Sequence, residues 1–250
     1  NIANSGIDVV GVLTQYKPLS LMEHLEDGRP WDIFGRTRNV EVLPPKTGEE
    51  TSDWYRGTSD AVWQNFNFIE EYSPEHVLVV SGDHIYNMNY NLLREFHEAQ
   101  QADATVCLIR VPEEEARHFG IAITDPDGRI ADWEEKPSKP RSNLSSMGVY
   151  IFTREDLAWA LARAAKKNGH DFAKDVIPVL LKQKRVCGYE FNGYWRDVGT
   201  IDAYWNANMD LLRTGSGLDI ENWQVKTNMT DRGEIGDRPS TYFGRFAEVR

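Results

Sequence analysis

Four branched aliphatic residues, followed by a glycine-containing turn and an acid, constrain this chain most strongly. The run from Val77 to Val80 is typical of a fully buried parallel strand, and Ser81, Gly82 and Asp83 follow it directly. Ligands of open α/β sheets bind outside the carboxyl ends of such strands. There Gly82 would let a ligand approach the backbone, and the Asp83 carboxylate would hold a hard cation such as Mg²⁺ against a phosphate. Taken alone, Asp83 fits a plain strand end or helix cap equally well.

The composition of the chain narrows the partners that it can have. A net charge of −11 over 250 residues argues against binding nucleic acid or an anionic membrane surface. No apolar run reaches the roughly 20 residues of a membrane span, and no signal peptide is visible. Cys107 and Cys187 both lie in apolar segments, which favours two buried free thiols in a reducing compartment. We therefore expect a soluble, cytoplasmic protein with no nucleic-acid and no membrane partner.

Strands and helices alternate through the first half of the chain. In the last predicted helix of this half, Leu92, Phe96 and Ala99 are expected to be buried. The alternation predicts an α/β fold with right-handed crossovers and a mostly parallel mixed sheet flanked by helices. The predicted strands are 7–14, 39–43, 77–80 and 104–110, and the predicted helices are 19–25, one helix that carries Val62, Phe66 and Ile69 on one face, and 90–101.

The pattern changes after residue 118. Segments 119–124 and 129–134 flank Asp125-Pro126-Asp127-Gly128 and predict a β-hairpin. The composition becomes polar beyond Thr214, so we predict a domain over 1–213 and a linker over 214–250 that leads out of it. The remaining predicted elements are strands at 146–152 and 186–191, a helix at 155–165 that buries Leu157, Leu161 and Ala164, and a helix with Ile201, Tyr204, Trp205, Asn208 and Leu211 in register.

Two further charged residues are candidates for the same chemistry as Asp83. Asp197 precedes a Val-Gly-Thr turn, and two aspartates at strand ends can share one Mg²⁺ for phosphoryl or nucleotidyl transfer. A salt bridge with a neighbouring Arg or Lys is the alternative for Asp197. Lys136 ends a strand before Pro137, where it is either a cation for a substrate phosphate or a solvated surface charge.

The aromatic and histidine residues are less informative. Trp54 and Tyr55 suit either a core anchor or a platform for a base, and Tyr194 and Trp195 suit either packing or stacking against a sugar ring. The six histidines show no metal-ligand spacing, so no zinc site is predicted.

Seven motifs in this order closely resemble glucose-1-phosphate adenylyltransferase, also called ADP-glucose pyrophosphorylase, a sugar nucleotidyltransferase. The resemblance runs from the first residue to about Leu212. The blocks at 54–61 and 194–200 are the most specific to the adenylyl branch, whereas Gly-Asp and Glu-Lys-Pro occur throughout the sugar nucleotidyltransferases. The motifs are 12–16 (VLTQY), 54–61 (WYRGTSDA), 81–86 (SGDHIY), 135–137 (EKP), 146–150 (SMGVY), 170–172 (HDF) and 194–200 (YWRDVGT).

The resemblance implies a Rossmann-like nucleotidyltransferase domain with a β-hairpin sugar-binding portion. The implied reaction converts ATP and α-glucose 1-phosphate into ADP-glucose and pyrophosphate, for glycogen or α-glucan synthesis, with Mg²⁺ as cofactor. Asp83 and Asp197 would ligate the metal, and Lys136 would pair with the sugar phosphate, which makes these three the expected catalytic residues. The implied substrate-binding residues are Glu135, Ser146, Asp171 and Trp195 for glucose, Gly120 in the sugar pocket, and Tyr55 and Gly57 at the adenine.

The resemblance leaves other expectations and alternatives open. The family opens with a strand and a glycine-rich phosphate loop, and it ends with a left-handed β-helix. Neither motif is in this sequence, so we expect a fragment of a longer protein that turns over little by itself. The family forms tetramers, so a homo-oligomer is expected of the full-length protein. Transfer of another nucleotide, uridylyl or thymidylyl, and a non-catalytic regulatory subunit are the alternatives. The retention of Asp83, Asp197 and Lys136 disfavours the regulatory subunit.

Overall fold

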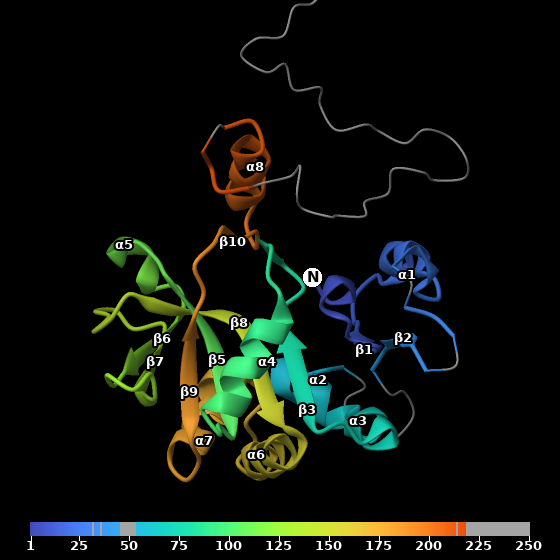
Figure 1. Cartoon of the computed structure of the whole chain (residues 1–250), viewed down its shortest axis with the longest axis horizontal. Coiled ribbons are helices and arrows are strands. Elements are labelled where there is room, and N and C mark those ends of the chain that lie inside the picture. Colours follow the sequence, from blue (N-terminus) through green and yellow to red (C-terminus); the bar gives the residue numbers. More distant parts are fainter. Residues whose placement is uncertain (32, 36, 46–53, 214, 219–250) are drawn as a thin grey trace, which may run out of the picture.

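A six-stranded mixed sheet forms the centre of the computed structural model, which describes residues 1–31, 33–35, 37–45, 54–213 and 215–218 (Figure 1). Its longest strand, β8 (Leu144–Thr153), pairs along one side with β5 (Ala104–Arg110). On its other side β8 pairs with β6 (Gly120–Thr124) near its start and with β3 (His76–Val80) toward its end. The sheet is completed by β7 (Ile130–Glu135) on β6 and β9 (Val186–Glu190) on β5.

The strand directions confirm a mixed sheet, but most neighbouring pairs are antiparallel. β8 runs opposite to β3, β5 and β6, so those three strands share one direction, and β9 lies parallel to β5. The expectation of mostly parallel pairing is therefore wrong for this sheet, because β8 returns between strands that the sequence pattern suggested were neighbours. A separate parallel pair is formed by β1 (Val9–Leu13) and β2 (Asn39–Leu43).

A short antiparallel ribbon projects beyond the end of the sheet. It consists of β4 (His84–Tyr86) and β10 (Trp195–Asp197), and its register pairs Asp197 with His84. β4 follows β3 after only three residues, so the ribbon continues from the strand that ends at Val80. This ribbon brings the segment around Asp83 to the segment around Asp197.

Helices cover both faces of the central sheet, and the alternation of strand side chains defines two cores. On one face Phe152 and Val106 pack with Leu157 and Leu161 of α6 (Arg154–Lys166). On the other face Cys107 and Val149 pack with residues of α4 (Tyr90–Ala99), which crosses the front of the sheet in Figure 1. The other helices are α1 (Leu19–Leu25), α2 (Thr58–Gln64), α3 (Phe66–Tyr72), α5 (Glu113–Ala116), α7 (Ile177–Leu181) and α8 (Ile201–Asp210), with 3₁₀ turns at Ala3–Ser5 and Arg29–Trp31 and a π-helical turn at Phe172–Val176.

Two details of the predicted helices are corrected by the structure. The helix expected through Val62, Phe66 and Ile69 is divided into α2 and α3 at Asn65, whose side-chain amide donates to the Ala61 carbonyl at 2.9 Å. The predicted buried face of α4 is also wrong. Leu92 is 51% exposed and Ala99 is exposed, whereas Tyr90, Leu93 and His97 are buried. The apolar spacing of α4 fits two overlapping faces, and contact with β5 and β9 selects the second.

Several other expectations about the fold are confirmed. Leu157, Leu161 and Ala164 are buried as expected. Cys107 and Cys187 are buried free thiols.

Within the described residues, every helix is too short or too polar to cross a membrane. Most of the linker predicted over 214–250 lies outside the described residues.

Candidate active site

The two predicted metal ligands come together at the β4–β10 ribbon. The Val198 amide donates to the Asp83 carbonyl at 3.1 Å, which extends the ribbon by one hydrogen bond. Donor atoms of Asp83, His84 and Asp197 all lie within 4.8 Å of one another. We call these three residues the acid–histidine cluster. Asp83 lies just before β4, His84 begins β4 and Asp197 ends β10, and only the pairing of these two distant segments makes the three residues neighbours.

The acid–histidine cluster fits a divalent cation. One carboxylate oxygen of Asp197 accepts the Gly199 amide at 2.7 Å, which fixes the side chain and leaves the other oxygen available to an ion. Asp83 has a 62% exposed side chain, so its carboxylate can also reach an ion. Among the described residues, no Lys or Arg pairs with Asp197, and the adjacent Arg196 instead pairs with Asp210 at 2.7 Å. The salt-bridge alternative for Asp197 is therefore not observed.

His84 is the residue of this cluster that sequence reasoning missed. It directly follows Asp83, and its Nε2 lies 3.4 Å from the nearer Asp83 oxygen. Spacing to other histidines and cysteines is the usual pattern of zinc sites, and His84 does not follow it. A signal was nonetheless present, because His84 follows an acid just beyond the carboxyl end of β3. The residues of β3 are half-buried, so the expectation of a fully buried strand there is wrong.

Glu135 and Gly120 belong to a second group of predicted site residues. They pair directly in the β6–β7 hairpin, and a Cβ at position 120 would lie 2.9 Å from Oε2 of Glu135. The same Cβ would lie 2.4 Å from the Trp133 ring, so only glycine fits this position without a shift of its neighbours. Oε2 of Glu135 is buried without a hydrogen-bond partner in the described structure. This leaves an acceptor available for a sugar hydroxyl.

The electrostatic surroundings of Glu135 also suit the binding of a polar ligand. Burial raises the pKa of Glu135, and the negative charge of Asp171 raises it further. The positive charges of Lys136 and Lys174 partly offset these effects. Two acids and two lysines therefore act on one another at the end of the β6–β7 hairpin, although Glu135, Asp171 and Lys174 come from segments far apart in the sequence.

Ser146 and Asp171 reach this group through Tyr150, which sequence reasoning did not assign to the site. The Ser146 hydroxyl donates to the Tyr150 hydroxyl at 3.3 Å, and the Tyr150 ring stacks on Phe172 with centroids 5.6 Å apart. Burial raises the pKa of Tyr150 to about 12, with contributions from Asp171 and Glu135. Asp171 precedes the π-helical turn and accepts the Lys174 amide at 2.9 Å. The motif at 146–150 contained the signal, since Ser146 and Tyr150 lie on the same face of β8.

Lys136 is held in an uncommon backbone conformation. Its φ is +46°, in the left-handed region, and its amide donates to the Phe119 carbonyl at 3.0 Å. This conformation costs roughly 1–2 kcal/mol in a residue with a Cβ. The side chain is exposed, and no ion pair holds it among the described residues. The ammonium is therefore exposed at the end of the β6–β7 hairpin, and its role toward a phosphate stays a prediction.

Trp195 connects the two groups of predicted residues. Its ring meets the His84 ring edge-on at 5.1 Å and the Phe119 ring at 5.4 Å. Phe119 in turn precedes Gly120 and accepts the Lys136 amide. The indole Nε1 is buried without a hydrogen-bond partner in the described structure. Trp195 thus lies between the acid–histidine cluster and the hairpin that carries Glu135 and Lys136.

Gly57 and Tyr55, the residues expected at the adenine, have clear structural contacts of their own. A Cβ at Gly57 would lie 2.3 Å from the His170 carbonyl oxygen, so glycine lets α2 approach the segment before Asp171. The Tyr55 hydroxyl donates to the Leu43 carbonyl at 2.9 Å and accepts the Asn65 amide at 2.8 Å. No contact in the described structure tests their role at the adenine, which stays a prediction.

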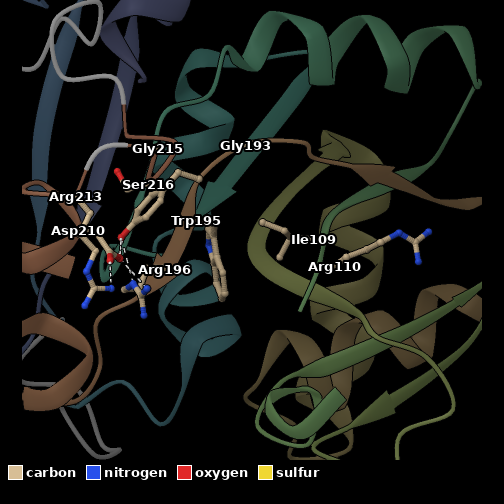
Figure 2. A pocket seen from close by; sticks show the side chains of 10 residues that line it. Ile109, Arg110, Gly193, Trp195, Arg196, Asp210, Arg213, Gly215 and Ser216 are labelled. Carbon is tan, nitrogen blue, oxygen red and sulfur yellow. Dashed lines mark hydrogen bonds and ion pairs between the residues drawn. The ribbon is translucent and has the colours of Figure 1, made fainter. Parts of the chain in front are cut away.

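A cavity of about 470 Å³ lies beside β10, and Trp195 is one of the residues that line it (Figure 2). Asp210 is 4% exposed there and pairs with both Arg196 and Arg213. Figure 2 shows Arg110 pointing away from this group, toward the far side of Ile109. None of the residues predicted for the site except Trp195 lines the cavity.

Comparison with known proteins gives the class first. The profile of the family described as "Nucleotidyl transferase" matches residues 1–214, so the chain belongs to the nucleotidyl transferase family. The relatives it matches are more particular. It is 50% identical to a glucose-1-phosphate adenylyltransferase of Clostridium acetobutylicum over 230 residues, covering 90% of this chain and 60% of that protein. It is 52% identical to one of Thermotoga maritima over 234 residues, covering 91% of this chain and 55% of that protein.

The chain thus spans about 55 to 60% of the length of these two curated relatives. A solved structure from Bacillus anthracis, described as a glucose-1-phosphate thymidylyltransferase bound to sucrose, shares the fold with a TM-score of 0.66. It covers 83% of this chain and 78% of that chain at 20% sequence identity. The resemblance to adenylyltransferases read from the motifs and the Rossmann-like nucleotidyltransferase fold are therefore confirmed.

Proposed function

We propose that this chain carries the metal and sugar-phosphate part of an active site that transfers adenylyl from ATP to α-glucose 1-phosphate, giving ADP-glucose and pyrophosphate. The convergence of Asp83 and Asp197 within 4.8 Å is the single observation that supports this most directly. Two carboxylates at that separation suit a hard divalent cation bound to phosphate oxygens. The names of the curated relatives favour adenylyl transfer over other nucleotides.

In this proposal Lys136 binds the sugar phosphate, and the two aspartates bind the metal. Lys136 pairs with the phosphate of glucose 1-phosphate, whose oxygen is already ionised at neutral pH and needs no general base. Asp83 and Asp197 act as ligands of Mg²⁺ and not as proton acceptors. When bound, Mg²⁺ supplies neutralisation of the charge on the phosphates. Alignment for in-line attack and charge neutralisation then account for catalysis.

The sugar is held by the group around Glu135. The unpartnered Oε2 of Glu135 accepts a glucose hydroxyl, and Asp171 and Ser146 supply further polar contacts. Gly120 leaves space that a side chain would fill. Trp195 presents an aromatic ring between sugar and metal. Tyr55 and Gly57 remain assigned to the adenine side.

We also propose that the full-length protein is a homo-oligomer, namely a tetramer, and that it is located in the cytoplasm. Uridylyl or thymidylyl transfer remains the second candidate, because the fold is shared with a protein described as a thymidylyltransferase.

The test is Mg²⁺-dependent synthesis of ADP-glucose by the chain and by the full-length gene product, with ATP, UTP and dTTP in competition. We expect ATP to be the preferred substrate and glucose 1-phosphate to bind the chain itself in calorimetry. Preference for UTP or dTTP would mean that the transferred group is uridylyl or thymidylyl and not adenylyl. Binding of glucose 1-phosphate without transfer in the full-length protein would favour the regulatory subunit.

A further inference from the structure

The His84 ring is fixed against the two acids by its neighbours. Its side chain is only 10% exposed, and the Trp195 ring meets it edge-on at 5.1 Å. On another side lies Gly148, which has a φ of +64° and where an added Cβ would lie 3.0 Å from Cε1 of His84. The imidazole therefore has little freedom to turn away from Asp83 and Asp197.

The ring nitrogens are poorly satisfied by the protein. Nδ1 is buried without a hydrogen-bond partner in the described structure. Nε2 lies 3.4 Å from the Asp83 carboxylate, which is longer than the usual range of roughly 2.7–3.2 Å for a hydrogen bond. Nε2 is therefore the ring nitrogen that lies toward the acids, and no hydrogen bond of ordinary length holds it to Asp83.

The geometry suits an ion between the nitrogen and the acids. Two ligands at about 2.1 Å from one cation lie roughly 3.0–3.4 Å apart, depending on the angle between them. The 3.4 Å between Nε2 of His84 and Asp83 falls at the upper end of that range. The Asp197 oxygen lies within 4.8 Å of both donor atoms, and the exposed Asp83 side chain is able to rotate toward an ion among the three.

We propose that His84 is the third protein ligand of the divalent cation, completing a set of one imidazole nitrogen and two carboxylate oxygens. This deepens the proposed function, on which it rests. Imidazole nitrogen favours Mn²⁺ and Co²⁺ over Mg²⁺, so the site should bind the transition metals more tightly. The preference among metals would then come from this one residue.

The test is a spectroscopic one on the purified chain with Mn²⁺ alone. Pulsed electron paramagnetic resonance detects modulation from a nitrogen bound to Mn²⁺. We expect ¹⁴N modulation in the wild type, its replacement by the ¹⁵N pattern after labelling with ¹⁵N-histidine, and its loss in His84→Gln. His118→Gln is the matched control, because His118 is exposed and distant from the acids in the sequence, and it should keep the modulation. Asp197→Asn should weaken Mn²⁺ binding at the same site.

Calorimetry provides the second readout. We expect Mn²⁺ to bind about tenfold or more tightly than Mg²⁺ in the wild type, and this preference to shrink in His84→Gln, where an amide oxygen replaces the nitrogen. Mn²⁺ that binds in an Asp197-dependent way without nitrogen modulation would overturn the assignment of His84. So would the absence of Mn²⁺ binding by the chain.

These outcomes are separable from failure of the proposed function. ADP-glucose synthesis by the full-length protein does not depend on the nature of the third ligand, so it would persist when only the His84 assignment fails. Should His84→Gln not fold, the ¹⁵N-labelled wild type and Asp197→Asn still decide whether a histidine binds the ion at the acids.

Discussion

The carbonyl oxygen of His170 lies 2.3 Å from the point where a Cβ at position 57 would sit. The same carbonyl accepts the Ser59 amide at 2.9 Å, so the start of α2 is fastened to the segment that carries Asp171. Gly57 is therefore needed for close packing of two backbones, independently of any contact with adenine. The position of Asp171 depends on this contact.

Gly57→Ala should destabilise the fold and displace Asp171. Overpacking of this kind costs about 1–3 kcal/mol, and we expect a loss of that size in the free energy of unfolding in urea. Gly82→Ala is the control for stability, because no atom lies within 4 Å of an added Cβ there and its φ is not positive. Equal stability of the two variants would contradict this account.

Asp197→Asn should greatly slow transfer by the full-length protein without unfolding it. The amide keeps an oxygen that accepts the Gly199 amide, so the turn before α8 is preserved, while a charged metal ligand is lost. We expect turnover to fall by about 10² or more, by analogy with the removal of other charge-stabilising groups. Steady-state rates at saturating Mg²⁺ measure this loss. Asp202→Asn, in the exposed first turn of α8, removes the same charge and should retain activity.

Lys136→Gly and Lys136→Ala should separate phosphate binding from backbone strain. Both variants remove the ammonium, so the KM for glucose 1-phosphate should rise about tenfold or more in each. The φ of +46° is easy for glycine and strained for alanine, so the glycine variant should be about 1 kcal/mol more stable than the alanine variant. Urea unfolding and initial-rate kinetics test the two effects. Lys139→Ala, an exposed neighbour, should leave KM unchanged.

Protonation of His97 should destabilise the protein at mildly acidic pH. His97 is 1% exposed, its Nδ1 bonds the Thr105 hydroxyl at 2.8 Å, and its Nε2 has no partner in the described structure. Burial first and then the nearby His76 lower its pKa, and Asp156 acts in the opposite direction, which together gives a pKa of about 4. The unfolded chain therefore takes up this proton first as the pH falls.

The sign of the effect follows from that order. The stability that neutral His97 contributes is fully present above pH 6.5 and is lost as the pH falls from 6.5 toward about 4. Its size is about 3 kcal/mol, from the difference between the two pKa values. Free energies of unfolding at several pH values in this window measure it. His97→Asn should start less stable but show a flatter dependence on pH, and an unchanged slope would refute the assignment.

The local patterns of the sequence predicted most of the elements. The strands at 39–43 and 104–110, the helix at 19–25 and the hairpin around residues 125–128 were found within a few residues of their predicted bounds. Branched aliphatic runs, alternation and turn residues are local signals, and they form the same structure in many contexts. The division of one predicted helix at Asn65 could not be foreseen, because it depends on hydrogen bonds to Ala61 and to Tyr55.

The acids of the candidate site were predicted from the sequence, but the residues that contact them were not. Asp83 and Asp197 were identified because each stands beside a glycine turn in a motif. His84 and Tyr150 were not, because their relevance comes from contacts with Asp83 and Ser146 that require the fold. α8 shows the same limit. Its stripe of apolar residues reads as a helix face, yet Ile201 is 86% exposed and Trp205 is 58% exposed.

The sequence by itself determined the order of strands and helices, the membership in a family and the acids at two strand ends, because these depend on short-range patterns and motifs. The tertiary structure alone decided which strands pair, which face of α4 is buried, and that a histidine turns toward the two acids. Those features arise from the pairing of β4 with β10 and from the return of β8 through the sheet. Contacts between distant segments depend on register and packing, which no local run of residues specifies.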